Sequence, residues 1–343
     1  MGLKAAGFNV TAAVEMDSHA ADTYTANHPE VDLMRKDIRD VLPMDLLDNN
    51  GDPPDLISGC PPCQGFTSLT AKYRREDPRN ALIKEMGRLI AGVRPKAVML
   101  ENVPGLESRG SKMLDDFLST LDCAGYVVRK RVLQVANYGV PQRRRRLVLL
   151  AGRGFPIELP AITHSRTGED GLPRWKSLKD AIGDVKSPMT LAEAQSQGGP
   201  SAAGWNIVGN ITELSKERYR STSPGDPRYK LPEKLRPECH KSEGKGFSNV
   251  YGRMSWDAPS PTITGGFMTP SKGRFGHPSE IRTISVHEAA LIQTFPEDYS
   301  FPVEHVQDVC SIIGNALPCD FATVVAARCA DAMASFAENG VDD

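Results

Sequence analysis

Short apolar runs alternate with helical stretches over the first 152 or so residues of the chain. The runs typical of strands lie at 9–14, 56–58, 97–100, 127–135 and 147–151. Apolar residues at helical spacing lie between them, roughly at 18–27, 80–93 and 111–124. This alternation predicts an α/β fold with a mostly parallel, doubly wound sheet of the Rossmann kind.

The pattern changes near residue 153. From there to about residue 250, Gly, Pro, Ser and Lys are frequent and no strong periodicity remains. The segment contains Trp175, Trp205 and several tyrosines, more than a disordered linker carries, so we predict a small, loop-rich second domain that contacts a partner. Order returns in 251–343, where Ser285 and Glu288 form a capping-box pattern and a last helix is predicted at 321–336. We therefore expect three parts, 1–152, 153–250 and 251–343, the third returning to the first domain.

Composition excludes several classes of protein. No apolar run approaches the ~18–20 residues that a membrane span needs, and the N-terminus lacks the layout of a secretory signal, so we expect a cytoplasmic protein. The seven cysteines are odd in number and mostly scattered, which fits neither a disulfide framework nor a four-ligand zinc site. Net charge is −2, but positive charge is concentrated at 129–131, 143–146 and 214–241, where a phosphate backbone can bind.

The loop at 58–67, SGCPPCQGFT, follows a predicted strand and carries two prolines and two glycines, so it is rigid. Ligands and chemistry gather at such strand ends in open α/β sheets. Cys63 is our candidate nucleophile, which requires a thiolate and hence a positive neighbourhood. Two alternatives remain at this point: a redox pair with Cys60, and a buried structural thiol.

Two further clusters of polar residues lie next to predicted strands, one just after a strand and one just before another. Glu101 and Asn102 follow the strand at 97–100, and a carboxylate there can exchange protons beside a thiolate. Gln142 precedes four arginines that lead into the strand at 147–151. In a strand register Arg144 and Arg146 share one face, while Arg143 and Arg145 share the other. One pair can therefore point into a site while the other meets solvent or phosphate.

Together these motifs resemble those of the DNA (cytosine-5)-methyltransferases, in the same order, from residue 1 to about 330. The similar segments are Pro62-Cys63-Gln64, Glu101-Asn102-Val103, Gln142-x-Arg144-x-Arg146, 253–264, Gln293-Thr294-Phe295-Pro296 and Gly314-Asn315-Ala316-Leu317-Pro318. The resemblance implies a catalytic domain with 153–250 as its target-recognition region. It also implies that Gln64, Thr67, Asn102 and Gln142 bind the DNA substrate.

The chemistry that the resemblance implies suits these residues. C5 of cytosine is a poor nucleophile, so Cys63 adds to C6 while Glu101 holds N3 and the exocyclic amine. Arg144, with Arg146, steadies the base and its developing charge. The activated C5 takes a methyl group from S-adenosyl-L-methionine, with no metal involved. Because C6 is inaccessible inside a duplex, the cytosine must be flipped out of double-stranded DNA.

Residues expected to bind S-adenosylmethionine also carry over. Glu15 suits the ribose hydroxyls and Met16 lies against the adenine. Asp37 and Ile38 match the pair that contacts the adenine. Pro62, Leu82, Asn315 and Ala316 complete the expected pocket.

The match breaks at its beginning. The family starts with a strand and a loop of the form Phe-x-Gly-x-Gly-Gly, whereas this sequence starts at MGLKAAGF, which resembles the helix after that loop. Without that central strand, two sets of strands should stand apart with unpaired backbone groups between them. We expect the given sequence to start at an internal Met of a longer reading frame, with a degenerate, inactive copy as the alternative.

Two other functions stay open at this stage. One is an RNA cytosine-5 methyltransferase, because the same nucleophile loop serves both substrates, and the other is a DNA-binding remnant that transfers no methyl group. For the leading interpretation we expect a monomer associated with the bacterial nucleoid, with a separate restriction endonuclease as a possible companion.

Overall fold

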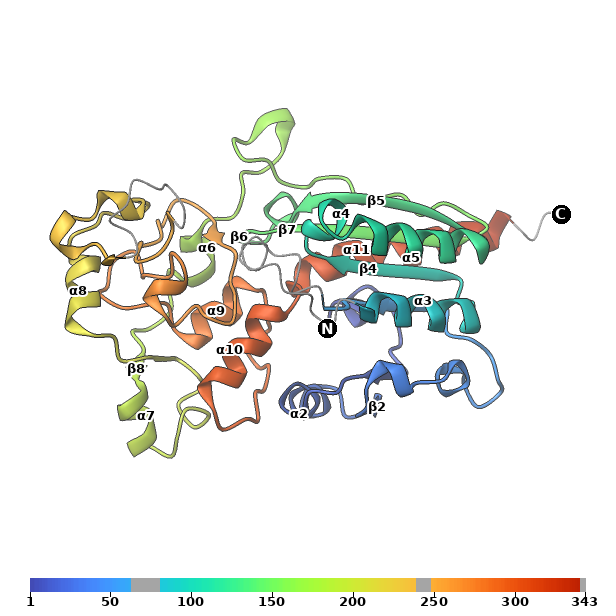
Figure 1. The fold of residues 1–343 in the computed structure, drawn as a ribbon, viewed down its shortest axis with the longest axis horizontal. Helices are drawn as coiled ribbons and strands as arrows, with labels where there is room; N and C mark the ends of the chain where they lie inside the picture. Colours follow the sequence, from blue (N-terminus) through green and yellow to red (C-terminus); the bar gives the residue numbers. More distant parts are fainter. Residues whose placement is uncertain (63–80, 239–247, 340–343) are drawn as a thin grey trace.

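A computed structural model describes residues 1–62, 81–238 and 248–339 of the chain (Figure 1). Its strands are β1 Ala12–Val14, β2 Asp32–Met34, β3 Leu56–Gly59, β4 Ala97–Asn102, β5 Tyr126–Gln134, β6 Gln142–Arg143, β7 Arg145–Arg153, β8 Met189–Thr190, β9 Ile207–Val208 and β10 Ser260–Pro261. Its α-helices are α1 Gly2–Ala5, α2 Ser18–Asn27, α3 Leu82–Val93, α4 Gly105–Ser108, α5 Ser111–Cys123, α6 Leu178–Ile182, α7 Leu191–Ser196, α8 Glu213–Arg220, α9 Val286–Ile292, α10 Val306–Asn315 and α11 Cys319–Asn339.

A four-stranded sheet in the order β3-β4-β7-β5 is the centre of the first part of the chain. Strands β3 and β4 are parallel, as predicted, but β7 runs antiparallel to both of its neighbours. Only residues 135–144 connect β5 to β7, too few for the crossover that a parallel neighbour requires. The α/β class is confirmed, and the sheet is mixed rather than mostly parallel.

Strand β4 is buried along its whole length because helices cover both faces of the sheet. Val98 and Leu100 pack with α3 and α5 on one face. Ala97 and Met99 alternate with them and pack with α11 on the other face. Because both faces are buried, the successive residues 97–100 of β4 are all apolar, and the sequence of this part of the strand is therefore a continuous apolar run.

Strands β1 and β2 form a separate parallel sheet, as the missing central strand predicted. In the described residues no ladder joins β1 to β3, and β3 is half-exposed where β4 is buried. Arg88 of α3 contributes to holding the two parts together by donating to the carbonyls of Ile38 and Val41. In Figure 1 the blue segment with β2 and α2 lies on the far side of α3 from β4.

A second core lies apart from the sheet and joins residues on both sides of position 250 (Figure 1). It includes Leu178 and Trp205 from residues 153–250, and Phe267, Val286 and Val309 from the later segment. Helix α11 returns to the sheet, where Phe321 and Val325 are buried. The boundary that we placed at residue 250 therefore falls inside one continuous core.

The stretch Val306–Glu338, which spans α10 and α11, is long and apolar enough to pass a composition test for a membrane span, with a mean hydropathy of 1.6. The two helices pack in different cores: Val309 and Ile313 belong to the second, and Phe321 and Val325 to the sheet. Burial against protein accounts for their apolar residues, as in the core helices of many globular proteins.

Candidate active site

The ends of β3 and β4 meet at one edge of the sheet, since the two strands are adjacent and parallel. Asn102, the last residue of β4, donates from Nδ2 to the carbonyl of Pro61 at 2.9 Å. This bond holds the start of the loop that leads to Cys63 beside the end of β4. Cys63, Gln64 and Thr67 themselves lie outside the described residues, and the description of this loop ends at Pro62.

Glu101 and Arg146 form the central ion pair of this edge. The Nε atom of Arg146 lies 2.6 Å from Oε1 of Glu101, and only 13% and 9% of the two side chains are exposed. Burial lowers the pKa of Arg146, and the Glu101 carboxylate opposes that effect. The antiparallel pairing of β4 with β7 places the two residues on neighbouring strands.

Arg144 lies beside this pair and is almost fully buried. Its Nη1 donates to the carbonyl of Ile263 at 3.0 Å and to that of Gly314 at 3.4 Å. Its Nε has no acceptor among the described residues. Burial and then the charge of Arg146 lower its pKa to about 9, so the guanidinium remains protonated at neutral pH. Arg143 and Arg145 are exposed, which confirms the predicted alternation of faces.

The thiol of Cys60 also faces this cluster, although the residue as a whole is exposed. Loss of hydration and then the Glu101 carboxylate raise the pKa of the Cys60 thiol well above its usual value, against the opposing effect of the two arginines. Cys60 is thus held as a neutral thiol, which is a poor nucleophile. This supports our prediction that Cys63, not Cys60, is the reactive cysteine.

The predicted substrate contact Gln142 is fully buried, and protein groups occupy both ends of its amide. Its Nε2 donates to Oε1 of Gln293 at 2.7 Å, and its Oε1 accepts from the backbone N–H of Ile263 at 3.0 Å. Asn102, another predicted substrate contact, is likewise engaged with the backbone of Pro61. In this structure both amides shape the walls of the site.

The residues predicted to bind the adenosine part of the cofactor follow the ends of the parallel strands β1 and β2. Glu15 accepts from the backbone N–H of Asp17 at 2.9 Å through Oε1. Asp37 accepts hydrogen bonds from Arg39, which lower the pKa of its carboxyl to about 2. Met16 is 65% exposed and Ile38 is half-buried, so apolar surface lies beside the carboxylates.

The remaining predicted cofactor residues lie on other elements. Leu82 begins α3 and is buried, Pro62 is half-buried, and exposed Asn315 and half-buried Ala316 end α10. Apolar surface and carboxylates at strand ends fit a nucleoside. No Gly-rich loop for its methionine end occurs among the described residues. The residues present therefore fit the adenosine half of S-adenosylmethionine.

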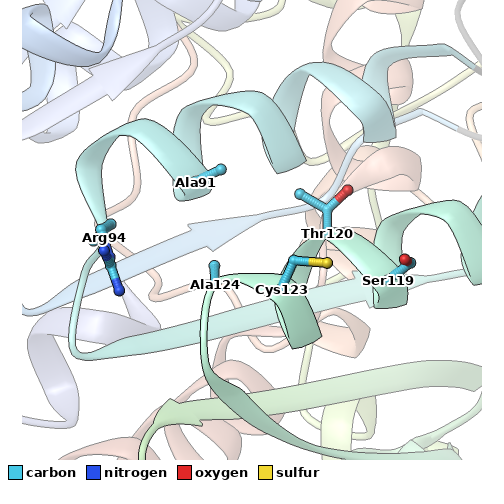
Figure 2. A pocket seen from close by; sticks show the side chains of 6 residues that line it. All are labelled: Ala91, Arg94, Ser119, Thr120, Cys123 and Ala124. Carbon is cyan, nitrogen blue, oxygen red and sulfur yellow. The ribbon is translucent and has the colours of Figure 1, made fainter.

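Two surface hollows lie away from this edge. One lies between the C-terminal ends of α3 and α5 and is lined by residues such as Arg94 and Cys123 (Figure 2). The other lies near Lys186 and Asn206, in the part of the chain that forms the second core. Neither is lined by a predicted site residue. In the parts of the chain that the structure describes, no cluster of His, Cys, Asp and Glu could hold a metal ion.

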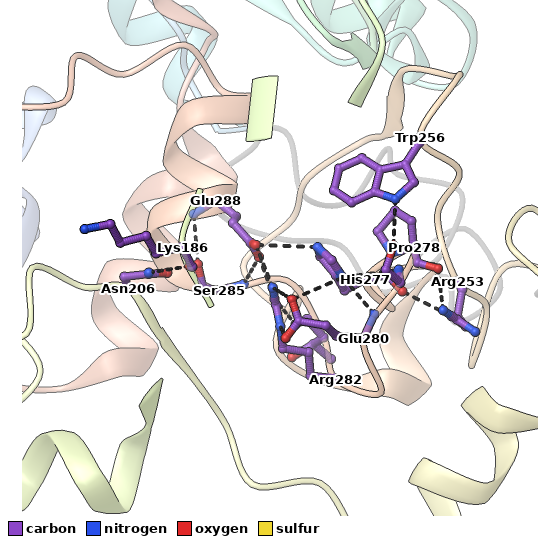
Figure 3. A network of polar contacts seen from close by, with 12 residues as sticks. Lys186, Asn206, Arg253, Trp256, His277, Pro278, Glu280, Arg282, Ser285 and Glu288 are labelled. Atoms are coloured by element: carbon purple, nitrogen blue, oxygen red, sulfur yellow. Dashed lines mark hydrogen bonds and ion pairs between the residues drawn. The ribbon is translucent and has the colours of Figure 1, made fainter. Parts of the chain in front are cut away.

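An ionic network lies beside the N-terminus of α9 (Figure 3). Arg282 pairs with Glu288 at 2.7 Å and with Glu280 at 3.0 Å. Glu288 also accepts from the backbone N–H of Ser285, which completes the predicted capping box. His277 accepts from the backbone N–H of Glu280 at 3.0 Å. All of these partners are protein groups, so the network stabilises the fold of this segment.

Sequence reasoning missed the side chain of Gln293 and the backbone of Ile263, both of which contact Gln142 of β6. Both lie in segments singled out by motif, but nothing in a linear motif shows that Gln293 meets Gln142 across 151 positions. Part of the positive charge of the recognition region is also structural. Arg218 and Arg236 donate to loop carbonyls, those of Leu235 and Leu231 respectively.

Comparison with known proteins extends these observations over nearly the whole chain. Residues 1–331 match the family model for C-5 cytosine-specific DNA methylase. The Type II methylase M.HgiDII of Herpetosiphon aurantiacus is 35% identical over 334 residues, which are 95% of this chain and 90% of that protein. Type II methyltransferase M1.BsuMI of Bacillus subtilis (strain 168) is 34% identical over 266 residues, 77% of this chain and 58% of that protein.

Solved structures share the fold. A DNA modification methyltransferase encoded within a prophage (E. coli) superimposes with a TM-score of 0.67 at 22% identity, covering 97% of this chain and 95% of that chain. The Dnmt2 methyltransferase of S. pombe gives a TM-score of 0.61 at 16% identity, covering 100% and 95%. At such low identity these two structures support the fold alone.

Proposed function

Because this chain belongs to the C-5 cytosine-specific DNA methylase family, we propose that it methylates C5 of a flipped-out cytosine through a covalent adduct of Cys63 at C6. The observation that carries this proposal is the buried Glu101–Arg146 pair beside the loop that leads to Cys63. S-adenosylmethionine, when bound, supplies an electrophilic methyl group.

Glu101 would hold the polar edge of the target base. Its Oε1 is buried and, apart from the ion pair with Arg146, has no hydrogen-bond partner among the described residues. Arg146 holds the carboxylate in one orientation, which suits an acceptor for an exocyclic amine. Arg144 contributes positive charge from behind the pair, and its unpaired Nε is a donor for the base or for its developing charge.

The thiol of Cys63 needs a positive neighbourhood to ionise, and Arg144 and Arg146 act electrostatically on Cys60 at the entry of its loop. The pair of half-buried prolines at 61 and 62 stiffens that entry, and Asn102 holds the first of them. Proton transfers around the base would use Glu101. Glu15, Met16, Asp37 and Ile38 would hold the adenosine half of the methyl donor.

We propose duplex DNA as the substrate, with residues 153–250 as the region that selects the target sequence. Its exposed positive side chains suit phosphate contacts. Relatives are named Type II methyltransferases, and a cognate restriction endonuclease acting separately fits that class. We further propose that the chain acts as a monomer on cytoplasmic, nucleoid-associated DNA.

Trapping with a duplex that contains 5-fluorocytosine tests the mechanism, because fluorine at C5 prevents release of the enzyme. With S-adenosylmethionine present, we expect the wild-type chain to form a covalent complex that survives denaturing electrophoresis. Cys63→Ser should form none, while Cys60→Ser, its matched control, should still form it. An adduct that depends on Cys60 and not on Cys63 would overturn the assignment.

A further inference from the structure

The amides of two buried glutamines form a continuous series of hydrogen bonds from β6 to the end of α10. Gln142 of β6 donates to Oε1 of Gln293 at 2.7 Å. Gln293, just after α9, donates from Nε2 to the carbonyls of Ile313 and Ala316. Both glutamines are fully buried, and the carbonyls of Ile313 and Ala316 account for both Nε2 hydrogens of Gln293. Each amide is thus locked in one orientation.

The far end of this series of hydrogen bonds caps α10. The last carbonyls of an α-helix have no partner within the helix, and a buried end needs one from outside. Here the amide of Gln293 supplies it on both sides of Asn315, by binding residues 313 and 316. Asn315 itself is exposed and projects from a backbone that Gln293 holds in place.

Gln142 and the nearby Arg144 also bind a second backbone segment. Gln142 accepts from the N–H of Ile263, and Arg144 donates to its carbonyl. Arg144 also reaches the carbonyl of Gly314, one residue from Asn315. Gln142 in β6 and Arg144, which lies between β6 and β7, therefore set the position of the 262–264 segment and of the end of α10 together.

We propose that Gln293 is a positioning residue for the methyl donor, holding the backbone of Asn315 and Ala316 where the donor binds. The inference rests on the proposed function and on the family resemblance, which implies that these two residues line the S-adenosylmethionine pocket. Gln142 acts through Gln293 by fixing the orientation of its amide. Loss of the amide would then weaken cofactor binding more than DNA binding.

Gln293→Glu is the sharpest test because it keeps the shape and the acceptor for Gln142. It replaces the donor with an oxygen that faces two carbonyl oxygens. We expect the Kd for S-adenosylhomocysteine, measured by isothermal titration at pH 8, to rise about tenfold, or about 1.4 kcal/mol. The KM for S-adenosylmethionine should rise in parallel, while kcat and the KM for DNA change by less than about twofold.

Gln307→Glu is the matched control. Gln307 is exposed on the same helix and donates to the carbonyl of Gly265, away from the helix end. It introduces the same charge and should leave the Kd within about twofold. If Gln293→Glu does not fold, Gln142→Met gives the second test, with an expected rise of about threefold in Kd because Gln293 loses its fixed orientation.

The outcomes separate this inference from the proposed function. An unchanged Kd in folded Gln293→Glu or Gln142→Met protein, or an equal loss in kcat and both KM values, would show a merely structural role and overturn the inference. A wild-type chain that fails to bind S-adenosylhomocysteine would overturn it as well. A wild-type chain that binds it normally but forms no Cys63 adduct would instead remove the proposed function.

Discussion

At the scale of single residues, the site depends on charges that are buried in pairs. Glu101 and Arg146 are each about nine-tenths buried and meet at 2.6 Å. Removing both charges from water is costly, and the pair is stable only because each charge has the other. Arg143, three positions earlier, is exposed and has no such partner in the described structure. Identical side chains in one short run therefore play different roles.

Arg146→Met should lower the free energy of unfolding by about 3–5 kcal/mol, because it leaves the Glu101 carboxylate buried without a counter-charge. Arg143→Met, at an exposed position, should change it by less than about 0.5 kcal/mol. Urea unfolding of the two variants and of the wild-type protein measures both values. Similar losses in the two variants would contradict the assignment of Arg146 to the buried pair.

At the scale of elements, the end of α10 is packed directly against another backbone segment. A Cβ atom on Gly314 would lie 2.1 Å from the backbone N of Gly265 and 2.4 Å from the carbonyl carbon of Thr264. Backbone cannot move aside as a flexible side chain can. Glycine is therefore required here by close approach, which also lets Arg144 reach the carbonyl of Gly314.

Gly314→Ala should destabilise the protein by about 1–3 kcal/mol, because the added methyl group forces α10 away from the 264–265 segment. Gly209→Ala is the control, since its Cβ would lie 3.5 Å from the terminal methyl of Met268, an ordinary contact. Thermal unfolding monitored by circular dichroism compares the two. A Gly314→Ala protein as stable as Gly209→Ala would show that the backbone approach is not close in solution.

At the scale of the whole molecule, the chain consists of a sheet with helices on both faces, a separate pair of strands, and a second core. The pair β1–β2 is joined to the rest by contacts such as those of Arg88 and of Asn27, which exchanges hydrogen bonds with the backbone of Ser300. Lys4 of α1 donates to Nδ1 of His28 at the end of α2. Protonation of that histidine would place two positive charges in contact.

Stability of the whole molecule should therefore fall on the acid side of neutrality. Burial, followed by the charges of the N-terminus and Lys4, lowers the pKa of His28 to about 4, and burial also lowers the pKa values of His164 and His277. The native state binds fewer protons than the unfolded chain. Stability is thus fully present above about pH 6.5 and is lost toward pH 4, by up to about 3 kcal/mol for His28.

Urea unfolding at half-unit steps from pH 7.5 to pH 4.5 measures this dependence. His28→Asn, which cannot gain a proton, should show a shallower fall than the wild-type protein over the same range. Equal slopes for the two proteins would contradict the assignment to His28.

The sequence by itself determined the family, the α/β class and the approximate positions of β1, β3, β4, β5 and β7, but not that of β2. It also identified Glu101, Arg144 and Arg146, because strand periodicity and motif order are local properties that a linear chain carries. The expectation that two sets of strands would stand apart agrees with the separate β1–β2 sheet.

Only the tertiary structure decided which of these residues meet. The antiparallel turn of β7, the common core of 178–313, the Gln142–Gln293 pair and the cap at the end of α10 all join residues far apart in the chain. Such contacts depend on how elements pack, and burial against a partner is what gives Arg144 and Arg146 roles that Arg143 and Arg145 do not have. Strand register predicted two alternating faces for the four arginines, and packing decided which face is buried.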